Sequence, residues 1–204
     1  MLGFTFAAAV NRYDTRKSVV LEEANAIGTA LLRTEFLPPP YDKAAADLLK
    51  QYLALRIAPA GRSLDDSSLR RAIAESVVFH DRLWRIAVAV SKAEPQSRPV
   101  SLFTQALNEV IDLHTTRLTA GRNHVPNSVI AVLFLLAMVS MGLVAYDSTL
   151  QGKRNGSALV VTAILTAGVL AVIIDMDQPA LGFLAIDQTP LIELLRSVGG
   201  PSRG

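Results

Sequence analysis

The chain has 204 residues, 50% of them hydrophobic, and a formal net charge of only +2. This length suits one or two compact units, and the positive mean hydropathy is high for a soluble domain. The small net charge gives no reason to expect nucleic-acid binding, and the lack of cysteine excludes disulfides and thiolate chemistry. The apolar excess must therefore be located along the chain.

The first segment, Met1 to Val10, is apolar and carries no charge. It is too short to cross a bilayer as a helix, and no basic region precedes it as in a secretory signal. Two interpretations stay open. Either the chain begins inside a longer membrane helix, or the segment is the buried start of a helix that lies against other membrane spans and continues into Arg12.

The region from Asn11 to His124 is charged and shows helical periodicity. Its predicted helices are Lys17 to Leu37, Ala44 to Ile57, Asp65 to Lys92 and Ser101 to Leu118. Three consecutive prolines at 38–40 end the first, because proline cannot continue a helix. Asp65 or Asp66 is placed to cap the third helix, and Gly121 closes the fourth. No alternating strand pattern of useful length appears, so the fold class is all-α.

Apolar stripes predict which faces of the last two of these helices are buried. The stripe residues are Leu69, Ile73, Val77, Trp84 and Val88 on the third helix, and Phe103, Leu107, Ile111 and Leu118 on the fourth. His80 and His114 fall on the same stripes, where a hydrogen-bonded core histidine is a commoner explanation than a metal ligand. The chain has no His-Glu-x-x-His motif, nucleophile elbow or phosphate-binding glycine loop, so we expect no enzymatic activity, metal or cofactor.

Two runs, Ser128 to Tyr146 and Ser157 to Ile174, contain no Asp, Glu, Lys or Arg. As helices they would span roughly 27 to 29 Å, close to the roughly 30 Å of a bilayer's hydrocarbon core. The connection between them, Asp147 to Gly156, is short and polar, so the sequence predicts a transmembrane helical hairpin within residues 125–174. The alternative is a pair of apolar central helices in a soluble bundle.

In the second run Ala163, Ala167 and Ala171 recur every four residues, a spacing that favours close helix packing in lipid. Thr162 and Thr166 lie on a neighbouring stripe, and their hydroxyls can bond carbonyls one turn back. A polar lumen is the alternative to packing. Because one hairpin offers few membrane neighbours to the alanines, we expect the chain to form homo-oligomers in the lipid bilayer.

Basic residues near the membrane ends indicate the orientation. Those on the side of residues 11–124 are Arg12, Arg16, Lys17, Arg117 and Arg122, against Lys153 and Arg154 in the hairpin connection. The predicted organisation is therefore an apolar stub at 1–10, a cytoplasmic helical region at 11–124, the hairpin at 125–174 and a cytoplasmic tail at 175–204. Asp175, Asp177 and Asp187 of the tail form a candidate cation-binding set, with helix capping or pairing with arginine as the alternative.

Several segments resemble the bestrophin-like family of bacterial membrane proteins, a domain of unknown function. They are NRYDTRK (Asn11 to Lys17), EEANAIGTALLR (Glu22 to Arg33), DMDQPALG (Asp175 to Gly182) and DQTPLIELL (Asp187 to Leu195). The resemblance implies an inner-membrane, multi-pass protein. Members carry further apolar sequence upstream and have four membrane helices, whereas this chain starts within the apparent end of the second.

A fainter similarity extends to bestrophins, which are pentameric ion channels. Its matching positions are Asn11, Tyr13, Asp14 and Arg16 at one end, and Asp175, Asp177 and Pro179 at the other. The resemblance implies a pentameric channel. It does not identify the ion.

On the first predicted helix Ser18, Glu22, Asn25 and Thr29 fall at i, i+4, i+7 and i+11 and share one polar face. We call these four residues the polar stripe. If several subunits set it around an axis, it would line a pore, and a ring of Glu22 carboxylates would favour cations. The alternative is ordinary solvated surface.

Three classes of function therefore stay open. They are an oligomeric ion channel, a membrane-anchored scaffold or sensor whose helices bind a cytoplasmic partner protein, and a membrane enzyme. The enzyme is disfavoured because the two apolar runs contain no ionisable residue. An exposed apolar patch on the helix bearing Trp84 would favour the scaffold.

Overall fold

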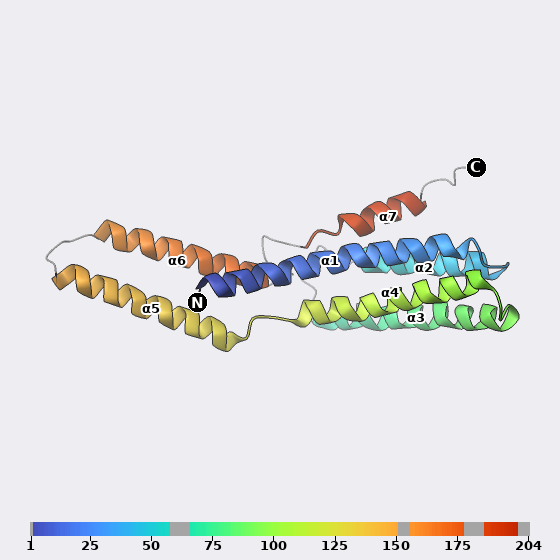
Figure 1. The fold of residues 1–204 in the computed structure, drawn as a ribbon, viewed down its shortest axis with the longest axis horizontal. Helices are drawn as coiled ribbons and strands as arrows, with labels where there is room; N and C mark the ends of the chain where they lie inside the picture. Colours follow the sequence, from blue (N-terminus) through green and yellow to red (C-terminus); the bar gives the residue numbers. More distant parts are fainter. Residues whose placement is uncertain (1, 58–65, 151–155, 178–185, 200–204) are drawn as a thin grey trace. The chain divides into compact units, whose positions relative to one another are not determined.

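The computed structural model describes residues 2–57, 66–150, 156–177 and 186–199, and all regular elements in these residues are α-helices (Figure 1). The helices are α1 (Leu2–Thr34), α2 (Tyr41–Ile57), α3 (Asp66–Ala93), α4 (Arg98–Arg122), α5 (Asn127–Leu150), α6 (Gly156–Asp177) and α7 (Thr189–Gly199). The predicted all-α class is confirmed for this part of the chain. Four predicted helices correspond to α1 to α4, with ends that differ by a few residues, and α1 starts much earlier than predicted.

The chain divides into two compact units. We call residues 1–15 and 121–185 the apolar unit, and residues 16–120 and 186–204 the bundle unit. These boundaries differ from those drawn on the sequence. The apolar segment at the N-terminus is part of one continuous helix, so the boundary falls within α1, and the predicted tail is shared between the two units.

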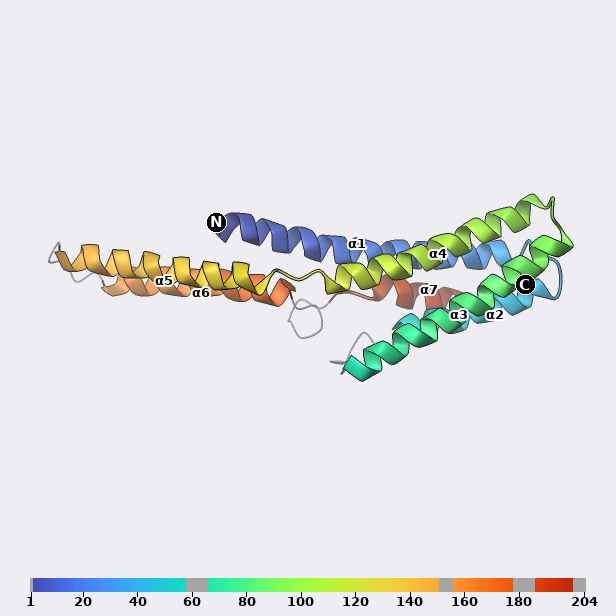
Figure 2. The same ribbon diagram turned by 90° about the horizontal axis from the view of Figure 1, so that it is seen from below.

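The bundle unit is built from two pairs of helices. Residues 16–34 of α1 pair with α4, because Arg16 Nε donates to the carbonyl of Ala120 at 3.0 Å and Arg33 Nη1 donates to that of Leu102 at 2.5 Å. The first bond joins the start of this segment to the end of α4 and the second joins its end to the start of α4, so the two helices run antiparallel. The second pair is α2 and α3, which lie side by side in Figure 2.

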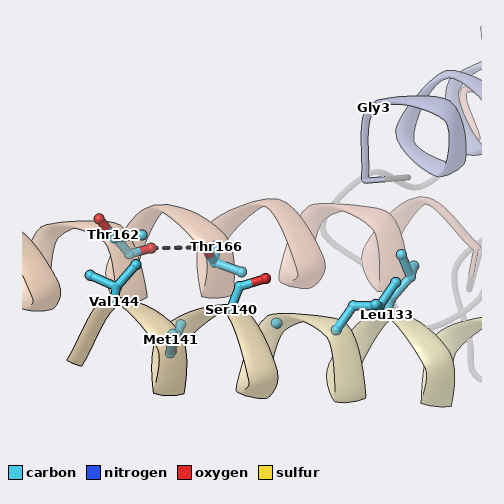
Figure 3. A pocket seen from close by; sticks show the side chains of 9 residues that line it. Gly3, Leu133, Ser140, Met141, Val144, Thr162 and Thr166 are labelled. Carbon is cyan, nitrogen blue, oxygen red and sulfur yellow. Dashed lines mark hydrogen bonds between the residues drawn. The ribbon is translucent and has the colours of Figure 1, made fainter. Parts of the chain in front are cut away.

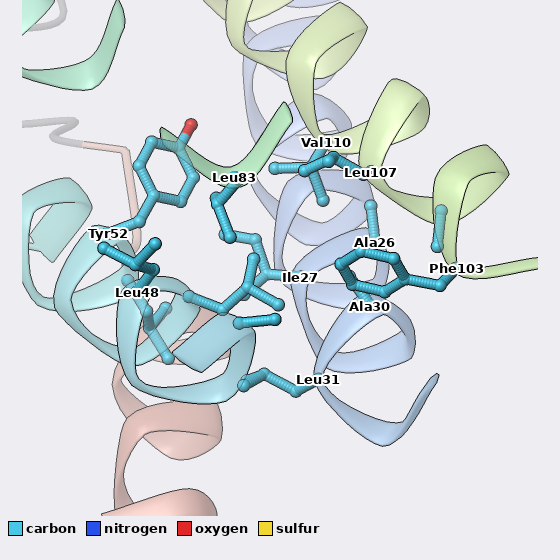
Figure 4. Close-up of a cluster of buried hydrophobic side chains, with 14 of the residues drawn as sticks. Ala26, Ile27, Ala30, Leu31, Leu48, Tyr52, Leu83, Phe103, Leu107 and Val110 are labelled. Carbon is cyan, nitrogen blue, oxygen red and sulfur yellow. The ribbon is translucent and has the colours of Figure 1, made fainter. Parts of the chain in front are cut away.

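The core lies between these helix pairs. Figure 4 shows Ile27 of α1 among Tyr52 of α2, Leu83 of α3 and Leu107 of α4, and all four side chains are fully buried. Leu191 of α7 joins the same core. The bundle therefore rests mainly on apolar contacts between helices that are distant in sequence.

The predicted core stripe of α3 was wrong for three of its residues, since Val77, Trp84 and Val88 are 48%, 39% and 40% exposed. Ile73 is half-buried, and the side chain of Leu69 lies outside the described part of the chain. The buried residues of α3 are instead Ser76, His80, Leu83, Ala87 and Val90. Burial follows the neighbouring helices, and the face of α3 in contact with them combines the polar Ser76 and His80 with the apolar Leu83 and Val90. On α4 Phe103 and Leu107 are buried as predicted, and Ile111 and Leu118 are half-buried.

In the apolar unit α5 and α6 lie side by side (Figure 1). The backbone N–H of Val125, just before α5, donates to Asp177 Oδ1 at the end of α6 at 2.8 Å, so the start of one helix meets the end of the other. Ala9 of α1 packs with Ile173 and Met176 of α6 in a small buried cluster. The N-terminal segment is therefore part of a helix that continues past Arg12, with Ala9 buried and Phe4 exposed, and both interpretations of it stay open.

Candidate functional site

The polar stripe lies along the outer face of α1. Ser18, Glu22 and Asn25 are exposed and Thr29 is half-buried. The opposite face, with Val20, Ala24, Ile27 and Leu31, is buried in the core. The shared polar face derived from helical spacing is therefore present, and its role in a pore stays a prediction.

A groove of about 530 Å³ runs beside this stripe, between α1 and α4. It is lined by Glu22 from α1 and by Gln105, Asn108, Glu109, Asp112, Leu113 and Thr116 from α4. Three of these side chains are carboxylates, so the groove is acidic. The sequence held a signal for it that we did not use, since Gln105, Glu109, Asp112 and Thr116 repeat the spacing i, i+4, i+7 and i+11 of the polar stripe.

Glu23, next to Glu22 in sequence, is fully buried and binds two arginines. Its Oε1 accepts from Arg56 Nε of α2 at 2.7 Å, and its Oε2 accepts from Arg117 Nη1 of α4. The Tyr52 hydroxyl donates to Oε1 at 3.4 Å, and Arg117 Nη2 donates to Gln188 Oε1 at 3.0 Å. One carboxylate thus ties together α1, α2 and α4.

The charge of Glu23 is maintained in spite of its burial. Desolvation raises the pKa of this carboxyl, but the positive charges of Arg56 and Arg117 and their hydrogen bonds outweigh it, so the pKa lies below its ordinary value. Burial, together with the neighbouring carboxylate, raises the pKa of Tyr52. The cluster therefore holds Glu23 ionised and Tyr52 neutral at physiological pH.

His80 of α3 and His114 of α4 extend this buried cluster. They are 7% and 4% exposed, and their rings meet edge to face with centroids 4.9 Å apart. The Tyr52 ring lies 5.1 Å from that of His80. The predicted core position of both histidines is confirmed, but the expected hydrogen bonding is incomplete, because His80 Nε2 and both ring nitrogens of His114 have no partner among the residues that the structure describes.

The apolar unit carries a groove of about 430 Å³ where α5, α6 and the start of α1 meet. Figure 3 shows Thr162 and Thr166 of α6 facing Ser140 and Val144 of α5 across it. Thr166 Oγ1 donates to the carbonyl of Thr162 at 2.8 Å, so this hydroxyl makes the bond one turn back that its position allowed. A second groove, of about 310 Å³, is lined by Ala167 and Ala171 of the alanine stripe among apolar side chains.

Comparison with protein families matches the bestrophin-like domain over residues 1–191. The chain belongs to the bestrophin-like family. This family is associated with membranes and related to the bestrophin channels. Neither the curated proteins nor the solved structures include a match to the chain.

The most specific bestrophin-like motif, Glu22 to Thr29, now has a physical basis. Glu23 makes the buried ion pairs, and Ala26 and Ile27 are buried in the core. Gly28 faces α7, where a Cβ atom would come within 3.3 Å of Leu194 Cδ1. The acidic, apolar and small residues of this motif therefore face different neighbours, namely the two arginines, the apolar core and α7.

Two of the three tail aspartates of this bestrophin-like chain accept hydrogen bonds near helix ends. Asp177 is buried and accepts the N–H of Val125, and Asp175 is half-buried. Asp187 is exposed and accepts from the N–H and hydroxyl of Thr189 at the start of α7, which lowers the pKa of its carboxyl. Among the described residues no group of three or more metal-ligating side chains exists. The cation site stays a prediction, and Pro179 and the rest of its motif to Gly182 lie outside the described residues.

Proposed function

We propose that this chain is a subunit of an oligomeric, bestrophin-like ion channel. The observation that carries the proposal is the acidic polar face of α1 and α4, which projects from a bundle in a member of a channel-related family. The proposal has three parts, namely membrane insertion, self-association and conduction.

Membrane insertion is supported by the apolar unit. Helices α5 and α6 are long and apolar enough to span a bilayer. Large apolar side chains on them, including Met138, Leu143, Ile164 and Leu165, are between 64% and 67% exposed. In a soluble bundle such surface would face water at a cost of about 25 cal/mol per Å², whereas lipid surrounds it without that cost. This argument favours a transmembrane hairpin in the cell membrane, with the bacterial inner membrane as its proposed location.

Self-association is supported by the grooves beside the alanine stripe. Ala167 and Ala171 lie exposed next to a concave surface, where a second helix can approach closely. We propose that neighbouring subunits occupy this surface. A pentamer is the stoichiometry that the family resemblance implies.

Conduction is supported by the polar stripe and the acidic groove. Repeating Glu22, Glu109 and Asp112 around an oligomer axis would produce rings of carboxylates, which attract cations and repel anions. We therefore propose a cation preference. Glu22 was singled out from the sequence, whereas Glu109 and Asp112 of α4 were not.

The test is single-channel recording from the purified chain in pure lipid, with the subunit number measured by native mass spectrometry. We expect unitary currents whose reversal potential in a KCl gradient indicates cations, and a weaker preference in Glu22→Gln. The matched control is Glu75→Gln, which neutralises an exposed carboxylate on α3. A silent, well-folded oligomer, or equal selectivity in both variants, would reject the pore at this face.

A second candidate, a membrane-anchored scaffold, is favoured by the exposed apolar patch of Val77, Trp84 and Val88 on α3. The exposed cations Arg85 and Lys92 lie on the same side of the helix together with the exposed Asp81, so the surroundings of the patch keep an excess of positive charge. An acidic, amphipathic protein segment would suit this patch. A photo-crosslinking residue at Val88 should then give a discrete adduct with another protein in cells. The same residue at Lys50, on the exposed side of α2, should not.

A further inference from the structure

We propose that His80 and His114 form an acid-sensitive contact at the centre of the bundle, and that protonation of either imidazole loosens α3 from α4. The contact joins two helices that the short segment between Ala93 and Arg98 connects at one end only. The rings pack edge to face at 82°, an arrangement suited to neutral aromatic groups. Two protonated rings at this separation would repel each other, so the contact is favoured while the rings are uncharged.

The hydrogen bonding of the pair favours the neutral form. Within the described part of the chain, His80 Nε2 and both ring nitrogens of His114 are buried without a partner. A neutral imidazole carries one N–H donor, whereas an imidazolium carries two. Protonation of His114 would thus leave two buried donors unsatisfied and add a buried charge, each of which disfavours the packed state.

The surrounding charges act in the same direction on balance. Around the pair, α1 contributes Glu23, α2 contributes Tyr52 and Arg56, α3 contributes Asp81 and α4 contributes Arg117. Tyr52 is neutral, Glu23 is already bound by both arginines, and Asp81 is exposed. The two arginines and one buried carboxylate leave the cluster with a net positive charge, which repels an imidazolium.

The titration follows from this environment. Both histidines have a pKa below the ordinary value of 6.5, mainly because they are buried and secondly because of the charge of Arg56. The pKa of His114 is lowered to about 4. A lowered pKa in the folded state means that the unfolded or opened state binds the proton first. Stability from the contact is therefore complete above about pH 6.5 and is lost as the pH falls toward 4.

The test uses the absence of cysteine from the chain. Spin labels on Glu75→Cys of α3 and Thr115→Cys of α4 report the distance between the helices in the full-length, lipid-reconstituted protein, with labelled subunits diluted by unlabelled ones. We expect the distance to lengthen with a midpoint between pH 4 and 6.5, and to stay constant in a double variant His80→Phe and His114→Phe. The variant His124→Gln should behave like the native chain, because His124 is exposed.

A second variant does not depend on the packing of the core. Asp81 follows His80 directly on α3 and stays beside it when α3 moves away from α4, so its charge raises the pKa of His80 in both the packed and the opened state. Asp81→Asn should therefore shift the midpoint to lower pH, while Asp47→Asn on α2 should leave it unchanged. A constant distance in the native chain, a transition that persists in the double variant, or an unmoved midpoint in Asp81→Asn would overturn the proposal.

The consequence for gating rests on the proposed function, and the two fail separately. If the chain conducts, its open probability should change with pH, because α4 carries part of the acidic groove. The midpoint of that change should equal the midpoint of the distance change between the spin labels. A chain that is silent but shows the transition would reject the channel and retain the acid-sensitive contact. A chain that conducts but shows no distance change would retain the channel and reject the acid-sensitive contact.

Discussion

At the scale of single residues, Glu22 and Glu23 are adjacent carboxylates with opposite environments. Glu22 is exposed, and Glu23 is buried between Arg56 and Arg117. Breaking a buried ion pair by removing one partner costs about 3 to 5 kcal/mol, since the remaining charge stays buried and uncompensated. We expect Glu23→Gln to lower the free energy of unfolding of the bundle by about this amount.

The neighbouring substitution Glu22→Gln is the matched control, and it should change the free energy of unfolding by less than about 0.5 kcal/mol. Chemical denaturation followed by the fluorescence of Trp84, the only tryptophan, measures both. Equal stability of the two variants would show that the Glu23 cluster does not hold the helices together.

The buried carboxylate of Glu23 should also make the stability of the bundle depend on pH, in addition to the histidine pair. The pKa of Glu23 is below its ordinary value of 4.5 in the folded state. Its contribution is therefore present above about pH 4.5 and is lost as the pH falls through the lower, folded-state pKa. The histidine pair acts between about pH 6.5 and 4, so the native chain should lose stability in two overlapping stages. Denaturation curves at several pH values should show the lower stage in the histidine double variant and not in Glu23→Gln.

At the scale of elements, α7 packs against α2 and also approaches α1 closely at Gly28. A side chain there meets Leu194, and overpacking of this kind costs about 1 to 3 kcal/mol. We expect Gly28→Val to detach α7 partly, raising amide hydrogen exchange in Thr189–Gly199 by roughly tenfold. Gly121→Val is the control, because a Cβ atom at Gly121 meets nothing within 4 Å. Exchange that rises equally in both variants would contradict this account of α7.

The elements also show what the sequence could and could not predict. The prolines at 38–40 and the apolar runs were enough to predict where helices end and begin, because both signals depend only on residues close together in sequence. Most of the buried face of α3 was missed, since contacts with other helices bury Ser76, Leu83 and Val90, and the pattern of a single helix does not show those contacts. Glu23 was missed for the same reason, as its partners are 33 and 94 residues away in sequence. The polar stripe was found because its residues share one face of one helix.

At the scale of the whole molecule, the exposed apolar surface of α5 and α6 must meet either lipid or protein. We expect Leu143→Cys and Ile164→Cys to resist a membrane-impermeant maleimide in membrane fragments whose two faces are both open to the reagent, and to react after denaturation, although these side chains are 64% and 65% exposed. The exposed position Glu75, replaced by Cys, is the reactive control. Reaction of Leu143→Cys in these fragments before denaturation would favour a soluble bundle with two apolar helices.

The same cysteine substitution determines the orientation. The basic residues Arg117 and Arg122 precede α5, which favours a cytoplasmic bundle. Glu75→Cys should therefore be protected in intact cells and react in inverted vesicles. Labelling from the outside would place the bundle, and with it the acid-sensitive histidine pair, in the extracytoplasmic compartment. The acid-sensitive contact would then respond to the pH outside the cell rather than to that of the cytoplasm.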